Sequence, residues 1–274
     1  MPAPAPPFIV MAMTDPAPAL FDRLADRYDQ VIPFFAEFAS QLLDVLAPPP
    51  GTHLLDVGTG RGAIGASAAA RGCVVTAVDA APRMVSLLAA AHPELDVRLM
   101  DAHRLDLPAA SYDLATAGFM IHLVTDPLRV LTGLRRVLRP GATVALTTPG
   151  PCEDGGRWDA WETLVGCFAS RAAERLPRRD YGVAAHLHAA GFADIRTVQL
   201  AVHLPVPSPQ ICWDFHMSHG FAAVVEALDT TDAVEFRRAA LTELTRMHES
   251  GGIVLDRGAV GYLASVPSED GPPR

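Results

Sequence analysis

The sequence predicts an α/β fold with a mostly parallel seven-stranded sheet flanked by helices. Apolar runs of strand length alternate with helical patterns from residue 53 to residue 147. Several of these runs are continuously apolar, which is typical of strands that are covered on both faces and therefore of parallel sheets. A glycine-rich turn joins the first run to the first of these helices. Together the three observations indicate a Rossmann-like arrangement.

The first half of the chain supplies five strands in a regular order. The expected strands are 53–57, 74–78, 97–100, 112–117 and 143–147. The expected helices between them are 63–71, 82–91 and 127–138. A further helical pattern precedes them from Phe21 to Leu46. Pro33 breaks this pattern, because proline lacks the N–H that a helix interior needs.

The pattern changes after Thr148, where helical segments separate two more strands. The expected helices are 158–176, 183–190 and several pieces within 208–249, and the expected strands are 192–204 and 253–264. We expect residues 151–181 and 206–250 to form a helical cap over the carboxyl edge of the sheet. Residues 20–266 are thus expected to form a single domain, with a core at 50–150 and amino-terminal helices at 20–47. The Pro- and Ala-rich residues 1–19 and residues 267–274 are expected to be loose tails.

Composition excludes several classes of protein. The chain has 274 residues, half of them hydrophobic, and a net charge of −9, which argues against nucleic-acid binding. Its four cysteines show no CxxC spacing, so neither a zinc site nor a disulfide framework is expected. No apolar stretch approaches the ~20 residues of a membrane span, and the amino terminus lacks signal-peptide features. These features predict a cytoplasmic protein with a small-molecule substrate and no metal, and they leave a homo-oligomer open.

The most informative segment is the apolar run that ends in Asp56 and Val57 and continues into Gly58-Thr59-Gly60-Arg61-Gly62. Glycines let the backbone approach a ligand closely. Asp79, at the end of the next strand, can accept hydrogen bonds from a ribose diol. Asp56 would repel a pyrophosphate but suits a ligand with an ammonium group. Asp101 follows the third strand, where it can read an adenine edge, so a nucleoside cofactor is predicted.

Four sequence blocks in the first half of the chain resemble one enzyme family. The chain is similar to class I S-adenosylmethionine-dependent methyltransferases, of the branch that includes ubiquinone, menaquinone and small natural-product methyltransferases. The matching blocks are 54–62, 75–84, 101–113 and 138–141, the last with the sequence Leu-Arg-Pro-Gly, and 21–29 resembles the first helix of the family. Leu105-Asp106-Leu107 departs from the Leu-Pro-Phe that is frequent in the family.

The resemblance implies that S-adenosylmethionine is the cofactor, with S-adenosylhomocysteine as its product. It assigns the ribose hydroxyls to Asp79, the adenine amino group to Asp101, and the glycine loop and the cofactor's amino group to Asp56. Tyr28 either closes over the methionine end or anchors the first helix, and Met84 either flanks the adenine or is core. The residues expected to contact the cofactor are Tyr28, Asp56, Gly58, Thr59, Gly60, Asp79, Ala80, Met84, Asp101, Ala102, Ala117 and Phe119.

Three histidines are candidates for a catalytic role. Methyl transfer depends mainly on proximity and orientation, although a general base helps when the acceptor must lose a proton. His122 follows the fourth strand, and His216 and His219 share a helical face at spacing i, i+3. For each of the three, a packing role is the alternative. No third ligand accompanies His216 and His219, so a metal pair is not favoured.

Aromatic residues in the predicted cap indicate a hydrophobic substrate, namely an aromatic, polyketide or terpenoid molecule. The alternative is that they only pack the cap. Arginines at 157, 171, 175, 178 and 179 leave a diphosphate open. Three other functions also stay open: a cyclase that binds S-adenosylmethionine without transferring methyl, an NAD(P)-linked oxidoreductase, and a non-catalytic cofactor-binding protein. The oxidoreductase is disfavoured, because no Tyr-x-x-x-Lys dyad is present.

Overall fold

The structure, a computed structural model, describes residues 17–172 and 182–268, and it divides into two compact units. Unit 1 comprises residues 17–34, 150–172 and 201–258. Unit 2 comprises residues 35–149, 182–200 and 259–268. The sequence analysis expected a single domain, and its two cap segments lie mostly within unit 1. Their placement over the carboxyl edge of the sheet stays a prediction.

A seven-stranded sheet organises the chain, as predicted, in the order β3-β2-β1-β4-β5-β7-β6. The pairs β1–β2, β1–β4, β2–β3 and β4–β5 are parallel. Strand order reverses beside β1, and the carboxyl ends of strands at such a switch point are where open α/β sheets bind ligands. The strands are β1 His53–Val57, β2 Val74–Asp79, β3 Asp96–Leu99, β4 Tyr112–Gly118, β5 Leu138–Gly150, β6 Ala193–Val206 and β7 Ile253–Ser265.

The helices that accompany the strands of unit 2 begin where the sequence predicts. Pro82 and Pro127 occupy the first turns of α4 and α5, where a missing N–H costs nothing. The carboxylate of Asp126 caps α5 by accepting from the amide of Arg129 at 2.9 Å. The helices are α2 Phe34–Leu46, α3 Ala63–Ala70, α4 Pro82–Ala91, α5 Pro127–Val137 and α7 Val183–Ala189.

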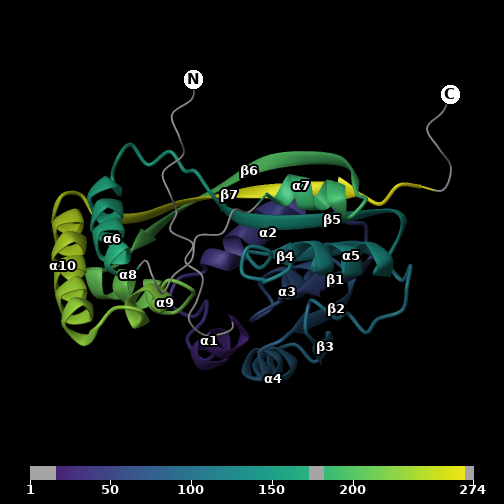
Figure 1. Ribbon diagram of the computed structural model, residues 1–274, viewed down its shortest axis with the longest axis horizontal. Coiled ribbons are helices and arrows are strands. Elements are labelled where there is room, and N and C mark those ends of the chain that lie inside the picture. Colours follow the sequence, from purple (N-terminus) through teal and green to yellow (C-terminus); the bar gives the residue numbers. More distant parts are fainter. Residues whose placement is uncertain (1–16, 173–181, 269–274) are drawn as a thin grey trace. The chain divides into compact units, whose positions relative to one another are not determined.

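Unit 1 is mainly helical and has its own aromatic-rich core. Within it, α10 packs beside α6 and α8 (Figure 1). Trp158 and Phe236 are fully buried in this core. Caps fix two helix starts, with Ser208 accepting from the amide of Ile211 and Asp229 from that of Asp232. The helices are α1 Ala17–Leu24, α6 Asp159–Arg171, α8 Pro209–His216, α9 Ala222–Glu226 and α10 Thr230–Glu249.

Several element boundaries differ from the sequence-based expectation. The fifth strand was expected at 143–147 but extends over Leu138–Gly150, because Leu138 already pairs with Tyr112 and the register then shifts by a bulge. The first helix ends at Leu24, and the chain then turns with Asp29 at φ 54°. That helix begins at Ala17, so three residues of the expected tail are helical. Residues 1–16, 173–181 and 269–274, which include most of both predicted tails and the end of the predicted helix 158–176, lie outside the described residues.

Candidate functional site

The glycine loop after β1 is shaped by close packing in unit 2. Gly58 has φ 67°, and a Cβ atom at this position would overlap the side chain of Met120. The amides of Gly58 and Thr59 donate to the carbonyl of Val78 at 2.9 and 3.1 Å. The loop is therefore held against the end of β2 with its backbone in a conformation that glycine adopts at little cost.

Asp79 ends β2 and joins two loops through backbone amides. Its Oδ2 accepts from the amide of Gly60 at 2.8 Å, and its Oδ1 accepts from the amide of Ala81 at 2.9 Å. A carboxylate oxygen can accept more than one hydrogen bond. The arrangement thus fixes the orientation of the carboxylate at the switch point of the sheet and suits a ribose diol. Ala80, the other predicted contact here, is partly buried.

Asp56 is buried near the end of β1, and its carboxylate holds the glycine loop through hydrogen bonds. Its Oδ2 accepts from the hydroxyl of Thr59 at 2.6 Å and the amide of Gly65 at 3.1 Å, and its Oδ1 accepts from the hydroxyl of Thr116 at 2.7 Å. Burial raises the pKa of Asp56 to about 6, although these hydrogen bonds oppose the shift. Its geometry accounts for holding the glycine loop, whereas a contact with the cofactor's amino group stays a prediction.

The end of β4 contributes a strained turn. Phe119 has φ 50°, an uncommon conformation for a non-glycine residue. Its amide donates to the carbonyl and the hydroxyl of Thr147 at 3.1 and 3.0 Å, which holds the turn in place. Ala117 precedes it in the strand and is fully buried. Backbone strain of this kind is often found at binding sites.

The predicted adenine side lies after β3. The carboxylate of Asp101 accepts from the amide of His103 at 2.9 Å and lies 2.8 Å from its Nδ1. The amide of Asp126 donates to Nε2 of His103 at 3.4 Å, so Nδ1 carries the proton in the neutral ring. Burial raises the pKa of Asp101, but the hydrogen bonds from His103 outweigh it and leave the pKa lowered. Ala102 is partly buried, and Met84 is fully buried in α4 as a core residue would be.

The structure places the three candidate catalytic histidines in different units. His122 belongs to unit 2, where burial lowers its pKa to about 3. His216 and His219 belong to unit 1 together with Tyr28, whose ring meets that of Phe21 edge-on. The predicted shared helical face is wrong, because α8 ends at His216 and His219 lies in the turn that follows. The turn nevertheless keeps the two rings close, with centroids 6.1 Å apart.

The histidine pair of unit 1 has defined tautomers. Nδ1 of His216 lies 2.7 Å from the carbonyl of Cys212 and must donate to it, which makes Nε2 the basic nitrogen. Nδ1 of His219 accepts from the amide of Phe221 at 3.3 Å, so in the neutral ring Nε2 carries the proton. Burial and then the charge of Arg257 lower the pKa of His219 to about 3 and that of His216 well below its usual value. Both rings are therefore neutral at neutral pH.

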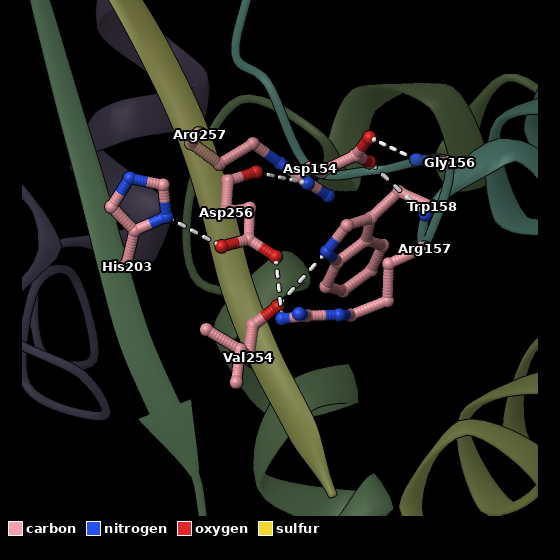
Figure 2. A network of polar contacts seen from close by, with 8 residues as sticks. All are labelled: Asp154, Gly156, Arg157, Trp158, His203, Val254, Asp256 and Arg257. Atoms are coloured by element: carbon pink, nitrogen blue, oxygen red, sulfur yellow. Dashed lines mark hydrogen bonds and ion pairs between the residues drawn. The ribbon is translucent and has the colours of Figure 1, made fainter. Parts of the chain in front are cut away.

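A polar network in unit 1 was missed by the sequence analysis (Figure 2). The buried carboxylate of Asp256 lies 2.8 Å from a guanidinium nitrogen of Arg157 and 2.6 Å from Nδ1 of His203. The next residue, Arg257, has its Cζ 4.0 Å from the ring centroid of Trp158. The adjacent acidic and basic residues inside the apolar strand pattern 253–264 were the signal in the sequence that could have indicated it.

The remaining predicted charges are already paired or lie outside the described residues. Arg157 pairs with Asp256, and Arg171 pairs with Asp232 and Glu235. The arginines at 175, 178 and 179 fall in the undescribed segment. Within residues 17–172 and 182–268, no cluster of three potential metal ligands occurs, and no helix is long and apolar enough to cross a membrane.

Comparison with known proteins decides the family. Residues 55–146 match a family model described as a methyltransferase domain. The nocamycin O-methyltransferase of Saccharothrix syringae is 33% identical over 272 residues, which cover 89% of this chain and 96% of the relative. The chain belongs to the class I S-adenosylmethionine-dependent methyltransferases. This methyltransferase is therefore an enzyme that uses S-adenosylmethionine, not an NAD(P)-linked oxidoreductase or a non-catalytic binding protein.

Solved structures confirm the fold. A putative methyltransferase from an antibiotic biosynthesis pathway of Anabaena variabilis superposes with a TM-score of 0.58 at 20% identity, over 82% of this chain and 95% of that one. The [4+2]-cyclase SpnF superposes with a TM-score of 0.52 at 20% identity, over 85% of this chain and 81% of that one. At this identity both likenesses concern the fold alone.

The residues of unit 2 fit the cofactor of the family. The fit rests on the glycine loop, whose amides hold it against the end of β2, and on the neighbouring carboxylate of Asp79, which two backbone amides orient. A backbone without Cβ atoms suits the methionine portion, and an oriented carboxylate suits a ribose diol. The individual contacts of the predicted residues with the cofactor stay predictions.

Proposed function

We propose that this methyltransferase methylates an oxygen atom of a small, largely hydrophobic metabolite in natural-product biosynthesis, such as an aromatic, polyketide or terpenoid molecule. The observation that carries the proposal is the extent of the similarity to the nocamycin O-methyltransferase. It covers 89% of this chain, whereas the methyltransferase domain model covers only residues 55–146. The similarity therefore includes most of unit 1, where the aromatic side chains are concentrated.

We propose that unit 2 binds the donor through the predicted residues around the switch point. Asp79 receives the ribose hydroxyls, Asp101 the adenine amino group, and the glycine loop of residues 58–60 the methionine portion. When bound, S-adenosylmethionine supplies a methyl group on a sulfonium, and the thioether leaves with the electron pair of the broken S–C bond. The protein's contribution is then to orient the acceptor and to exclude water.

The three histidines are proposed to act as neutral hydrogen-bonding groups rather than as strong bases. Burial lowers the pKa of His122 and His219 to about 3, and His216 shifts in the same direction. A group with so low a pKa removes a proton from an ordinary alcohol inefficiently. Nε2 of His216 can accept a hydrogen bond and Nε2–H of His219 can donate one, so the pair can orient an acceptor oxygen.

The experiment that tests the function is product mass. Purified enzyme is incubated with S-adenosylmethionine and a panel of hydrophobic phenols, enols and carboxylic acids, and the products are analysed by mass spectrometry. Gain of one CH₂ with stoichiometric S-adenosylhomocysteine supports methyl transfer. A rearranged product of unchanged mass would favour the cyclase alternative, which the fold of SpnF also accommodates. Methyl transfer only to nitrogen or carbon acceptors would contradict the assignment to oxygen.

We also propose the cellular location, the domain organisation and the oligomeric state of the enzyme. The net charge of −9 supports the absence of a nucleic-acid partner. The four cysteines, which show no CxxC or disulfide-framework spacing, support a cytoplasmic location. The domain organisation is proposed as a core at 50–150 with acceptor-binding helical segments from 151–181 and 206–250. A homo-oligomer is proposed through the amino-terminal helices, and analytical ultracentrifugation tests it, since a monomer at micromolar concentration would contradict it.

A further inference from the structure

Arg257 is a partly buried cation without a counter-ion among the described residues. Its Cζ lies 4.0 Å from the ring centroid of Trp158, and its Nη1 donates to the carbonyl of Asp256 at 2.7 Å. Within residues 17–172 and 182–268, no carboxylate lies within 4.0 Å of its guanidinium nitrogens. A guanidinium carries five N–H donors, so most of its hydrogen-bonding capacity is not used by these contacts.

Two carboxylates near Arg257, those of Asp256 and Asp154, are engaged with other groups (Figure 2). Asp256 forms an ion pair with Arg157 and a hydrogen bond with Nδ1 of His203. The carboxylate of Asp154 accepts from the amides of Gly156 and Trp158 at 2.8 and 3.1 Å. Glu162 also acts electrostatically on Arg257 but forms no ion pair with it. Because a buried charge is costly unless it is closely paired, the lack of a direct ion pair leaves the guanidinium N–H groups of Arg257 available to a ligand.

The histidine pair adds polar groups of both kinds beside this cation. The charge of Arg257 acts on both His216 and His219, which places the three side chains in one electrostatic neighbourhood. Trp158 lies between Arg257 and His216: the guanidinium is over its ring, and its ring centroid is 6.0 Å from that of His216. Trp161 lies 4.7 Å from His216, centroid to centroid, and is itself buried in the aromatic core of unit 1. The cluster thus combines a cation, a neutral donor and a neutral acceptor within aromatic walls.

We propose that Arg257 binds an anionic oxygen group of the acceptor, a carboxylate or the enolate of a 1,3-dicarbonyl, while the aromatic residues of unit 1 contact its hydrophobic body. Planar guanidinium groups match such oxygen pairs in a bidentate geometry. The inference rests on the proposed function, because it assumes that unit 1 holds the acceptor. It narrows the substrate class from hydrophobic to hydrophobic and acidic.

Among the described residues, which do not include the arginines at 175, 178 and 179, the charges favour a monoanion over the diphosphate that the arginine content had left open. Arg157 and Arg171 are both neutralised by carboxylates, so Arg257 is the cation without one in the described part of unit 1 that faces this cluster. One guanidinium balances one carboxylate or enolate, whereas a diphosphate needs several cations. An acidic acceptor is also already ionised at neutral pH, so it needs no strong base, in keeping with the neutral histidines.

The experiment compares two probes of the same chain length and similar size, one with an anionic carboxylate and the other with a neutral amide head group. Sodium decanoate and decanamide are titrated into the enzyme while tryptophan fluorescence is recorded. All three tryptophans of the chain, Trp158, Trp161 and Trp213, belong to the core of unit 1 and report on it directly. We expect decanoate to bind about tenfold more tightly than decanamide, as for a charge-assisted hydrogen bond. Arg257→Gln should abolish this preference and leave decanamide binding unchanged, and Arg257→Lys should restore part of it.

Arg246→Gln is the matched control, because Arg246 is a surface arginine of unit 1 that pairs with Glu243. It should keep the preference for decanoate. Equal binding of the two probes to the unmodified enzyme, binding of neither, or an unchanged preference in Arg257→Gln would overturn the proposal. If Arg257→Gln fails to fold by thermal unfolding, the comparison between the unmodified enzyme and Arg257→Lys decides. Calorimetry with S-adenosylhomocysteine separates the two proposals, because normal cofactor binding with no charge preference rejects only the anion site.

Discussion

The two units hold their polar groups in different ways. In unit 2, Asp79 and Asp56 lie at strand ends and accept hydrogen bonds from backbone amides and a hydroxyl of the segment 59–65, which are 3 to 19 residues away along the chain. In unit 1, Arg257 and the pair His216 and His219 lie among aromatic rings contributed by separate helices. The first arrangement is made by local backbone geometry and the second by tertiary packing.

The largest expected effect comes from the backbone of unit 1. A Cβ atom at Gly258 would overlap the carbonyl of Pro151, and neither backbone can move aside as a flexible side chain can. Gly258→Ala should therefore lower the free energy of unfolding by about 3 kcal/mol, measured by urea denaturation. Gly166→Ala is the control, because that glycine is in α6 with open space around it and should gain about 0.5–1 kcal/mol. Equal effects of the two changes would contradict the packing argument.

The next effect tests the donor side. Asp79→Ala should weaken the binding of S-adenosylhomocysteine by about 1–3 kcal/mol, because a charge-assisted hydrogen bond is lost and the amide of Gly60 loses its acceptor. Isothermal titration calorimetry measures the change. Asp106→Ala removes an exposed carboxylate of the same unit and should leave the affinity unchanged. Unaltered affinity in Asp79→Ala would remove this residue from the site.

His122 is the candidate histidine of unit 2, so a change at this residue tests whether unit 2 contributes to turnover as well as to donor binding. His122→Ala should lower turnover by about tenfold without changing cofactor affinity, if the neutral ring orients the reactants. Steady-state kinetics and calorimetry on the same variant make this distinction. Full activity would reduce His122 to a packing residue, and a matching loss of cofactor affinity would move its role to the donor.

The smallest expected effect depends on pH. Burial raises the pKa of Asp56 to about 6, and a positively charged cofactor favours the ionised form, so binding should lower that pKa and release protons. Affinity for S-adenosylmethionine should therefore fall as the pH is lowered through about 6. Calorimetry in buffers of different ionisation enthalpy detects the protons. In Asp56→Asn this component should disappear, and a pH dependence identical to that of the unmodified enzyme would contradict the assignment.

The sequence by itself determined the α/β fold, the bounds of β1 and α4, and the position of Asp79 beside the glycine loop. These features depend on residues close together in the chain, such as a proline at a helix start or a glycine after a buried strand. The regular strand pattern also carried the family resemblance, because the spacing of the motifs follows from the repeating β–α unit.

Only the tertiary structure decided the pKa shifts of His216 and His219, the polar contacts of Asp256 and the environment of Arg257. Asp154, Trp158, His216 and Arg257 come from segments up to 103 residues apart, and no local pattern specifies that they meet. The shifts in histidine pKa arise from burial, which depends on how α6, α8 and β7 pack. The charge state of a buried group depends on neighbours that are distant in the sequence, so it can be inferred only after the fold has brought those neighbours together.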